Sequence, residues 1–179
     1  MAETNRYESP LGSITLAAKD GALLGLWLEG QRCAPCKERE GGVERSDTEI
    51  LSRAKRWLCR YFAGERPAID ELPLAPAGSA FAKAVWRILC EIPYGETTTY
   101  GEIAKRIARE NGLFKMSAQA VGGAVGRNPI SIIIPCHRVV GANGNLTGYD
   151  GGIEKKRWLL AHEGLELSRF HVPAGKRAQ

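Results

Sequence analysis

The stretch Ile-Ile-Ile-Pro-Cys-His-Arg-Val-Val at residues 132–140 constrains both the fold and the chemistry of this chain. Three consecutive β-branched residues favour a buried strand. Pro135 lacks an N–H and fixes φ, so it ends such a strand and can open a short helical turn. Cys136 would then lie at the positive end of that turn, where the nucleophilic thiolate is favoured. The alternative is a buried structural cysteine, because free cysteine is among the most buried residue types.

The size and charge of the chain limit the class of protein. Its 179 residues suffice for one ordinary domain, or for a small domain joined to a second compact one. We expect no contact with a membrane and a cytoplasmic location, because there is neither a run of about 18 apolar residues nor an apolar signal segment at the start. The net charge of +5 weakly favours a polyanionic partner such as nucleic acid.

The five cysteines do not form a recognisable framework. An odd number without a signal segment argues against a set of disulfides. Cys33 and Cys36 have C-x-x-C spacing, but no second pair of ligands follows at zinc-ribbon spacing and no βαβ pattern surrounds them. A metal or redox role for this pair is an alternative, whereas our prediction is that the protein uses no metal and no cofactor.

The first part of the chain predicts a lobe made of a sheet and a helix. Two strand-like runs at residues 13–18 and 22–28 flank an Asp-Gly, which is a hairpin signal. Residues 31–46 are polar and predict a loop, and Asp47 can cap a helix that reaches about Phe62. Three prolines between residues 64 and 78 indicate a linker. We therefore expect an N-terminal lobe with its linker at residues 1–78.

The remainder of the chain predicts a helical lobe at residues 79–166. Helices of about 100–109 and 118–125, joined by a tight loop, are typical of a helix-turn-helix. A glycine-rich loop leads to a last helix at about 153–162, and residues 167–179 predict a mobile tail. The expected fold class is α/β (α+β). The helix caps expected in this lobe are Ser79, Thr98 or Thr99, and Ser117.

His137 follows Cys136 directly, and this limits their geometry. Adjacent side chains on a helical turn diverge by about 100°, so we expect a water to bridge the imidazole and the thiol. Such a base needs an orienting partner on its far nitrogen. Glu163 is our choice, because it closes the last helix, where a carboxylate can be partly buried. The alternative is a surface glutamate, since Glu is seldom buried unless paired. The other acidic candidates are Asp150, Glu154 and Glu166.

The residues around Cys136 carry a family resemblance. Pro135-Cys136-His137-Arg138-Val139 resembles the active-site signature of O6-alkylguanine-DNA alkyltransferases, also called methylated-DNA–protein-cysteine methyltransferases. Residues 79–166 as a whole match that family in order and spacing. The other matching motifs are Tyr94-Gly95-Glu96-Thr97-Thr98-Thr99-Tyr100, Ala120-Val121-Gly122-Gly123-Ala124, Asn128-Pro129, Gly148-Tyr149, Gly151-Gly152 and Trp158-Leu159-Leu160-Ala161-His162-Glu163.

The resemblance implies a single-turnover DNA repair reaction carried out by a monomer without a cofactor. An alkyl group would pass from O6 of guanine in double-stranded DNA irreversibly to Cys136, after the nucleotide has left the base stack. The resemblance gives His137 the role of taking the thiol proton through water and Glu163 that of orienting the imidazole. Tyr100 would help to rotate the nucleotide and donate toward guanine N3, and Asn128 would brace the active-site turn. The range of alkyl groups, and whether O4-alkylthymine is accepted, stay open.

The resemblance also implies a set of substrate and DNA contacts. Small residues on the second helix of the helix-turn-helix would let its backbone press into the minor groove. Two positions depart from the family: Gln119 stands where many relatives carry an arginine that fills the gap left by the flipped base, and Asp150 stands where many carry serine or another small residue. The expected contacts are Tyr149, Asp150, Gly151, Gln119, Ala120, Gly122, Gly123, Arg127 and Arg138, with phosphate contacts from Lys105, Arg106, Arg109, Lys115 and Arg127.

Two other functions are alternatives to alkyl transfer. One is a sensor that binds alkylated DNA without reacting, but relatives of that kind have the cysteine replaced, and Cys136 is present here. The other is an unrelated Cys–His hydrolase, which needs a separately placed oxyanion hole and a histidine that reaches the thiol.

Overall fold

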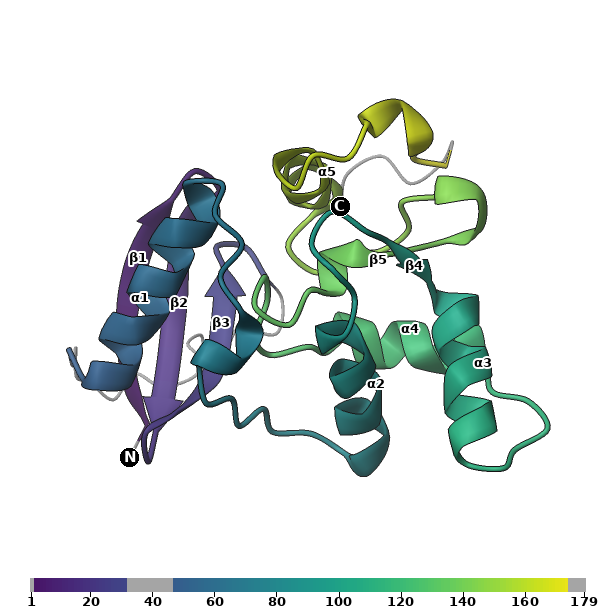
Figure 1. The fold of residues 1–179 in the computed structure, drawn as a ribbon, viewed down its shortest axis with the longest axis horizontal. Helices are drawn as coiled ribbons and strands as arrows, with labels where there is room; N and C mark the ends of the chain where they lie inside the picture. The colour runs from purple at the N-terminus through teal and green to yellow at the C-terminus, as the bar shows by residue number, and fades with distance from the viewer. Residues whose placement is uncertain (1, 32–46, 174–179) are drawn as a thin grey trace. The chain divides into compact units, whose positions relative to one another are not determined.

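The computed structural model describes residues 2–31 and 47–173, and the chain divides into two compact units (Figure 1). The first unit comprises Met1–Ala77 together with Pro129–Ile133, and the second comprises Gly78–Asn128 and Ile134–Gln179. The chain therefore returns to the first unit for five residues shortly before Cys136, which the sequence did not indicate. Cys33 and Cys36, for which a metal or redox role was considered, lie outside the described residues.

An antiparallel sheet forms the base of the first unit. Its strands lie in the order β1-β2-β3, with bounds of Glu3–Ser9, Gly12–Lys19 and Ala22–Leu28. Asp20 and Gly21, which join β2 to β3, have φ values of 51° and 75°. Two successive residues with positive φ match the right-handed twist of a hairpin, so the predicted Asp-Gly turn is confirmed.

Two distant segments cover the free edge of β3. A register shift in the β2–β3 pairing leaves Leu24 without a partner, so the backbones of both Leu23 and Leu26 face outward. Leu23 exchanges hydrogen bonds of 2.8 and 2.9 Å with residues 73–75. Leu26 exchanges bonds of 2.8 and 3.0 Å with residues 129–131. Pairing this edge removes a row of exposed backbone donors and acceptors.

Helix α1 (Glu49–Phe62) packs across the sheet (Figure 1). Asp47 was expected to cap this helix, but Thr48 is the N-cap residue, and the Asp47 carboxylate instead binds Asn5 and Lys55 at 2.6 and 3.1 Å. The buried face follows the helical spacing expected from the sequence. Its residues are Ile50, Leu51, Ala54, Trp57, Leu58 and Tyr61.

The three isoleucines at residues 132–134 are buried, but the predicted strand is wrong. Ile132 has φ of 69°, which a β-branched residue adopts only under strain. The N–H of Ile133 donates to Ser131 at 2.8 Å, and that of Cys136 donates to Ile134 at the same distance, so this segment turns on itself. A continuous run of apolar residues predicts that the segment is buried, but it does not distinguish a strand from a tightly turned segment of the core.

The second unit contains four helices within the described part of the chain. Their N-caps confirm the predicted Ser79, Thr99 and Ser117, whose side chains accept hydrogen bonds from the first turns. Trp86 donates from Nε1 to the carbonyl oxygen of Ala124 at 2.9 Å and so joins the first and third of these helices. None of the helices in the described ranges is both long and apolar enough to cross a membrane. The four are α2 (Ala80–Cys90), α3 (Tyr100–Glu110), α4 (Ala118–Gly126) and α5 (Ile153–His162).

Short elements connect these helices around the Cys136 segment. The 3₁₀ helix η3 (Cys136–Arg138) is followed at once by β5 (Val139–Val140), which pairs in parallel with β4 (Thr98–Thr99). The N–H of Leu146 and the carbonyl oxygen of Gly144 both bond to His171, at 2.8 and 3.1 Å. The remaining 3₁₀ helices are η2 (Ile69–Glu71) in the first unit, and η4 (Ala142–Gly144) and η5 (Leu167–Arg169) in the second.

Residues 167–172, which we expected to begin a mobile tail, are instead held against the second unit. Leu167, Phe170 and Val172 pack on a buried cluster of Val140, Leu146 and Leu160. The sequence looked mostly polar here, but three apolar residues at spacings of two and three suffice to cover that cluster. The expectation of a mobile tail is therefore wrong for these residues.

A substitution at Gly25 of β3 can test how tightly the side chains on the sheet are packed. A Cβ atom at this position would lie 1.8 Å from the ring of Trp27, which folds back over the glycine. We expect Gly25→Ala to lower the free energy of unfolding by about 1–3 kcal/mol, because the buried ring has to shift. Urea unfolding measures this change. Gly126→Ala is the matched control, since a Cβ atom there meets open space, and an equal loss in both variants would contradict this account.

Candidate active site

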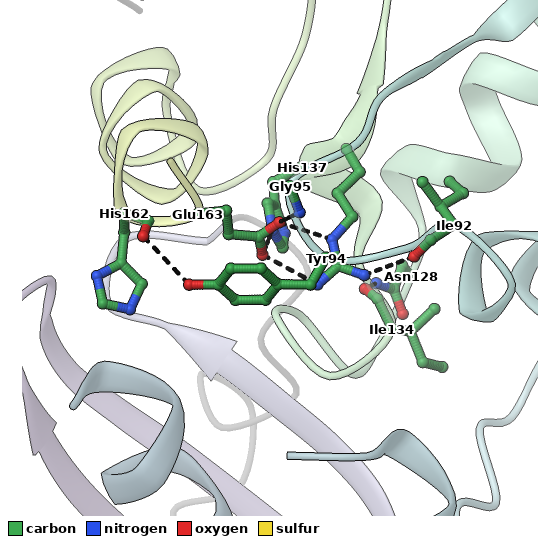
Figure 2. A network of polar contacts seen from close by, with 9 residues as sticks. Ile92, Tyr94, Gly95, Asn128, Ile134, His137, His162 and Glu163 are labelled. Atoms are coloured by element: carbon green, nitrogen blue, oxygen red, sulfur yellow. Dashed lines mark hydrogen bonds and ion pairs between the residues drawn. The ribbon is translucent and has the colours of Figure 1, made fainter. Parts of the chain in front are cut away.

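Cys136 begins the short helix η3, as its position after Pro135 predicted. The side chain of Asn128 donates from Nδ2 to the carbonyl oxygen of Ile134 at 2.8 Å and ties the turn to the end of α4 (Figure 2). Asn128 and Cys136 are 5% and 6% exposed, so this brace and the thiol are both buried. The turn that carries the sulfur is therefore held by the side-chain amide of Asn128, which follows α4 in the same unit.

Glu163 is the partner of His137. The imidazole Nε2 lies 2.7 Å from Oε1 of Glu163, and both side chains are fully buried. The alternative of a surface glutamate at the end of α5 is wrong, because Glu163 is only 4% exposed. Residues 26 positions apart in the chain are thus joined in one buried contact.

Four donors converge on the Glu163 carboxylate (Figure 2). Oε1 receives His137 and, at 3.0 Å, Nη2 of Arg138. Oε2 receives Nε of Arg138 at 2.8 Å and the backbone N–H of Gly95 at 3.1 Å. Burial alone would raise the pKa of Glu163, but the hydrogen bonds from His137 and Arg138 and the charge of Arg138 hold that pKa well below its usual range.

This charge on Glu163 decides which nitrogen of His137 carries the proton. An ionised carboxylate only accepts hydrogen bonds, so Nε2 of His137 is the protonated nitrogen and Nδ1 has the free lone pair. Nδ1 is buried and has no hydrogen-bond partner among the described residues. Burial lowers the pKa of His137, and the nearby Glu163 only partly opposes this effect. The imidazole is therefore a neutral base with one acceptor available.

Arg138 belongs to the same network and does not face solvent. It is 6% exposed, its Nη1 donates to the carbonyl oxygen of Ile92 at 2.6 Å, and its guanidinium lies 5.7 Å from the centre of the Tyr94 ring. The expected DNA or substrate contact of Arg138 is therefore wrong in this structure, because all three guanidinium nitrogens already donate within the buried network. Its two bonds to Glu163 form a bidentate pair, which neutralises the buried carboxylate.

The acidity of the Cys136 thiol differs from the expectation. Burial raises the pKa of Cys136, so the end of a three-residue 3₁₀ helix does not by itself produce a thiolate. Asn128, Lys156 and Tyr149 lie beside the sulfur and act in the opposite direction. The thiol is thus protonated at rest, in an environment in which three neighbouring groups favour its ionised form.

Lys156 is a buried cation that the sequence analysis did not single out. It has no measurable exposure, and its Nζ donates to the carbonyl oxygen of Val139 at 2.5 Å and lies 6.0 Å from the centre of the Tyr100 ring. Burial lowers the pKa of Lys156 to about 8, and the charge of Cys136 acts against this shift. Within the described residues no carboxylate pairs with it, so an ionised Cys136 would be its natural counter-ion.

Two tyrosines complete the surroundings of the sulfur. The hydroxyl of Tyr100 donates to the carbonyl oxygen of Thr147 at 3.1 Å, and burial together with the Cys136 charge raises the pKa of Tyr100 to about 12. The buried hydroxyl of Tyr149 has no well-formed bond to another described residue, although it lies close enough to Cys136 to influence it. Burial raises the pKa of Tyr149 well above its usual value, so both phenols are protonated donors.

The other predicted contacts lie outside this buried group. Asp150 and Gly151 are half-buried next to Tyr149, and Gly122 and Gly123 are half-buried along α4. A Cβ atom at Gly122 would meet the Tyr100 ring at 3.7 Å, so the glycine face of α4 lies beside that ring. Gln119, Ala120 and Arg127 are exposed, as are Lys105, Arg109 and Lys115, whereas Arg106 is half-buried and bound to Glu91 and Glu110. No three His, Cys, Asp or Glu side chains in the described ranges are grouped so as to hold a metal ion.

Comparison with known proteins places this geometry in a family. Residues 5–76 match the 6-O-methylguanine DNA methyltransferase ribonuclease-like domain, and residues 80–165 match the DNA binding domain of the same proteins. The chain belongs to that methyltransferase family. It is 44% identical over 174 residues to a methylated-DNA–protein-cysteine methyltransferase of Mycolicibacterium paratuberculosis, which covers 97% of this chain and 96% of the relative.

Solved structures agree with this membership of the methyltransferase family. The crystal structure of the Mycobacterium tuberculosis O6-methylguanine methyltransferase superposes with a TM-score of 0.76 at 42% identity, covering 97% of this chain and 96% of that one. A crystal structure of the Mycobacterium tuberculosis protein in complex with DNA superposes with a TM-score of 0.74 at 42% identity, covering 97% and 95%. The resemblance seen in the sequence and the mixed α/β fold are both confirmed.

The residues that sequence reasoning missed are those whose role depends on burial. Lys156 reads as one of two adjacent lysines in a charged stretch of α5, and only the structure separates the buried residue from its neighbour. The N–H of Gly95 and the ring of Tyr94 lie in a motif that carried the resemblance, so that motif was an available signal.

The neutral state of His137 predicts a pH dependence of stability. Because its pKa is lower in the folded protein, the unfolded chain binds more protons below about pH 6.5, and stability falls as the pH decreases through that region. We expect the free energy of unfolding to fall by up to about 1.4 kcal/mol per pH unit between about pH 6.5 and pH 5. In His137→Gln, which cannot titrate, this slope should be absent. Urea unfolding at several pH values checks it, and equal slopes in both proteins would refute the assignment.

The position of Lys156 predicts the acidity of Cys136. Replacing the cation in Lys156→Met raises the pKa of the thiol, so less thiolate is present at pH 7 and alkylation of Cys136 by iodoacetamide becomes slower. At a fixed pH, the alkylation rate should fall about tenfold for each unit by which the pKa of the thiol rises. Above about pH 8 the native lysine loses its own charge, and the two rates should converge. Peptide mass spectrometry measures the rates. Lys155→Met is the matched control, and a rate ratio that stays constant with pH would contradict the electrostatic explanation.

Proposed function

We propose that this protein repairs DNA by transferring a methyl or other alkyl group from O6 of guanine to Cys136, which it consumes in the reaction. The family membership supports the reaction, and the single observation that supports these residues is the buried Glu163 carboxylate bound to His137 and Arg138, the two residues that follow Cys136. A new bond forms between Sγ and the alkyl carbon as the bond between O6 and that carbon breaks. The product is a thioether, which water does not cleave, so each molecule reacts once.

The proton of the thiol leaves through His137. A water between Sγ and Nδ1 of His137 carries it, because Nδ1 is the nitrogen with a free lone pair and adjacent side chains on the turn point apart. Glu163 stabilises the resulting imidazolium and fixes the plane of the ring. Guanine, released from its alkyl group, takes up one proton in return, so the reaction adds and removes none overall.

Two neighbouring groups assist the change of charge. Lys156 stabilises the thiolate as it forms, since no carboxylate in the described residues competes for this buried cation. Tyr100 donates toward N3 of the guanine as negative charge develops on the base. Its raised pKa keeps the phenol protonated and therefore able to donate. Asn128 holds the turn so that the sulfur meets the carbon in line.

The DNA has to bring the guanine to the sulfur. Cys136 is only 6% exposed, so the nucleotide must leave the duplex and enter the unit in which the cysteine lies. Tyr149 forms an apolar wall of the guanine site, and Asp150 and Gly151 lie next to it in the chain. Because an ionised Asp150 would repel O6, its backbone N–H is the group we assign to the base.

The helix pair α3–α4 serves as the helix-turn-helix. Helix α4 enters the minor groove with the small residues Ala120, Gly122 and Gly123 toward the backbone of the DNA. Exposed Gln119 occupies the gap left by the flipped base, and exposed Arg127 adds a positive charge to a phosphate. We also retain a cytoplasmic location and a monomeric state as predictions.

Intact-mass measurement tests the reaction. Mixed with an excess of duplex DNA that contains O6-methylguanine, the protein should gain one methyl group, about 14 Da, on the peptide that carries Cys136, and no more after longer incubation. Cys136→Ala should bind the same DNA and gain nothing. Cys59→Ala, which removes an exposed cysteine, is the matched control and should react as the native protein does.

The same experiment distinguishes alkyl transfer from the alternative of a sensor that binds alkylated DNA without reacting. Binding of the modified duplex without a gain of mass would favour the non-catalytic sensor and overturn the transfer reaction. A methyl group found on Cys59 or Cys90 would overturn the assignment of Cys136, and repeated turnover would overturn the single-use mechanism.

A further inference from the structure

Two large apolar side chains lie exposed, next to each other, in the connection between α3 and α4. Leu113 is 48% exposed and Phe114 is fully exposed at 105%, and no other large apolar residue in the described ranges is exposed. Single exposed apolar residues are common on protein surfaces and need no explanation. Two adjacent ones, on the connection between the helices proposed to bind DNA, mark this connection as a contact surface.

The two helix ends hold Phe114 away from the protein. At the end of α3, Gly112 has φ of 63° and the N–H of Leu113 donates to Ala108 at 2.8 Å, which is the hydrogen bond of a Schellman cap. On the other side Ser117 caps α4 with its side chain. Only three residues separate Leu113 from Ser117, and Figure 1 shows the connection as a loop that extends beyond the end of α3. Phe114 is thus presented by an anchored turn.

The surroundings of the apolar pair are basic. Lys105, Arg109 and Lys115 are exposed on the same helix and loop. The nearby carboxylate of Glu110 is taken up by Arg87 and Arg106, at 2.5 and 2.9 Å, and so adds little negative charge. An apolar tip among cations fits a duplex, because phosphates bind the cations while sugars and base steps accept the apolar group.

We propose that Phe114 enters the minor groove of the DNA as an apolar wedge beside the damaged nucleotide, with Leu113 packed on the adjoining sugars. This inference rests on the proposed function, because it needs α4 to lie in that groove. Proteins that deform DNA from the minor groove often insert Phe or Leu between base steps. Such a wedge supports the extruded nucleotide in a chain where Gln119, shorter than arginine and uncharged, fills the gap.

The length of the chain limits where the wedge can act. Phe114 and Gln119 are five positions apart in the chain, so the two side chains are anchored at most about 18 Å apart, or about five base steps along one strand. The wedge therefore contacts the same short stretch of duplex as α4, and a DNA of about a dozen base pairs contains the whole proposed site.

Phe114→Ala tests the wedge directly. The residue is exposed, so its thermal midpoint should match that of the native protein. We expect the dissociation constant for a duplex carrying O6-methylguanine to rise by about tenfold, as is typical for loss of an aromatic contact to a base. The rate of methyl transfer from the free O6-methylguanine base, which involves no duplex, should not change. Phe114→Leu should restore most of the affinity.

Salt dependence separates an apolar wedge from a general surface effect. Phe114→Ala should leave the slope of log affinity against log salt unchanged, since no phosphate contact is lost. Lys115→Ala, the neighbouring cation, is the matched comparison and should reduce that slope by about one.

The outcomes distinguish this inference from the function on which it rests. If Phe114→Ala binds the duplex as tightly as the native protein does, the proposed wedge is overturned. The wedge is also overturned if the only effect of the variant is a change in self-association, measured by sedimentation. If the native protein binds the duplex with the predicted dependence on Phe114 but transfers no methyl group, the proposed reaction fails while the wedge stands.

Discussion

The buried carboxylate of Glu163 is the interaction on which the active-site unit depends. Its four donors come from Gly95, His137 and Arg138, segments 68, 26 and 25 residues away in the chain. A charge removed from water is stable only when such partners replace its hydration, and the loss of one leaves an uncompensated charge. The end of α5, the loop before β4 and the turn that carries Cys136 must therefore all be in place together.

That network also divides the buried charges of the site into two groups. Glu163 and Arg138 neutralise each other, and burial keeps His137 neutral although Glu163 partly opposes this effect. The partners of Lys156 are the carbonyl oxygen of Val139 and, once the Cys136 thiol has ionised, the negatively charged sulfur. Protonation of His137 and ionisation of the sulfur thus add an ion pair to each group, and neither step leaves a lone charge in the interior.

The sequence predicted those parts that depend on local chemistry. Ser79, Thr99 and Ser117 cap helices because their side chains reach donors within the next turn, and the Asp-Gly hairpin follows from backbone preferences alone. The strand predicted from the isoleucine run is wrong, because these residues are buried in the core without having an extended backbone. Arg138 and Lys156 look like surface cations in the sequence, since only contacts from distant segments bury them. Glu163 was chosen among four acidic candidates because it closes the last helix, and its burial confirms that a helix end can hold a buried carboxylate.

The chemistry and the recognition of DNA make opposite demands on the same unit. The sulfur needs a buried environment, in which Asn128, Tyr149 and Lys156 can influence it strongly because water does not screen them. The DNA needs an exposed surface, and residues 109–120 supply one that is continuous except for half-buried Met116. Tyr100 connects the two, since it begins α3, lies beside Gly122 of α4 and has its ring near Lys156. In the function proposed here, a base that passes this tyrosine leaves the exposed side of the unit and reaches the buried one, so that one ring would set both the path of the nucleotide and the surroundings of the thiol.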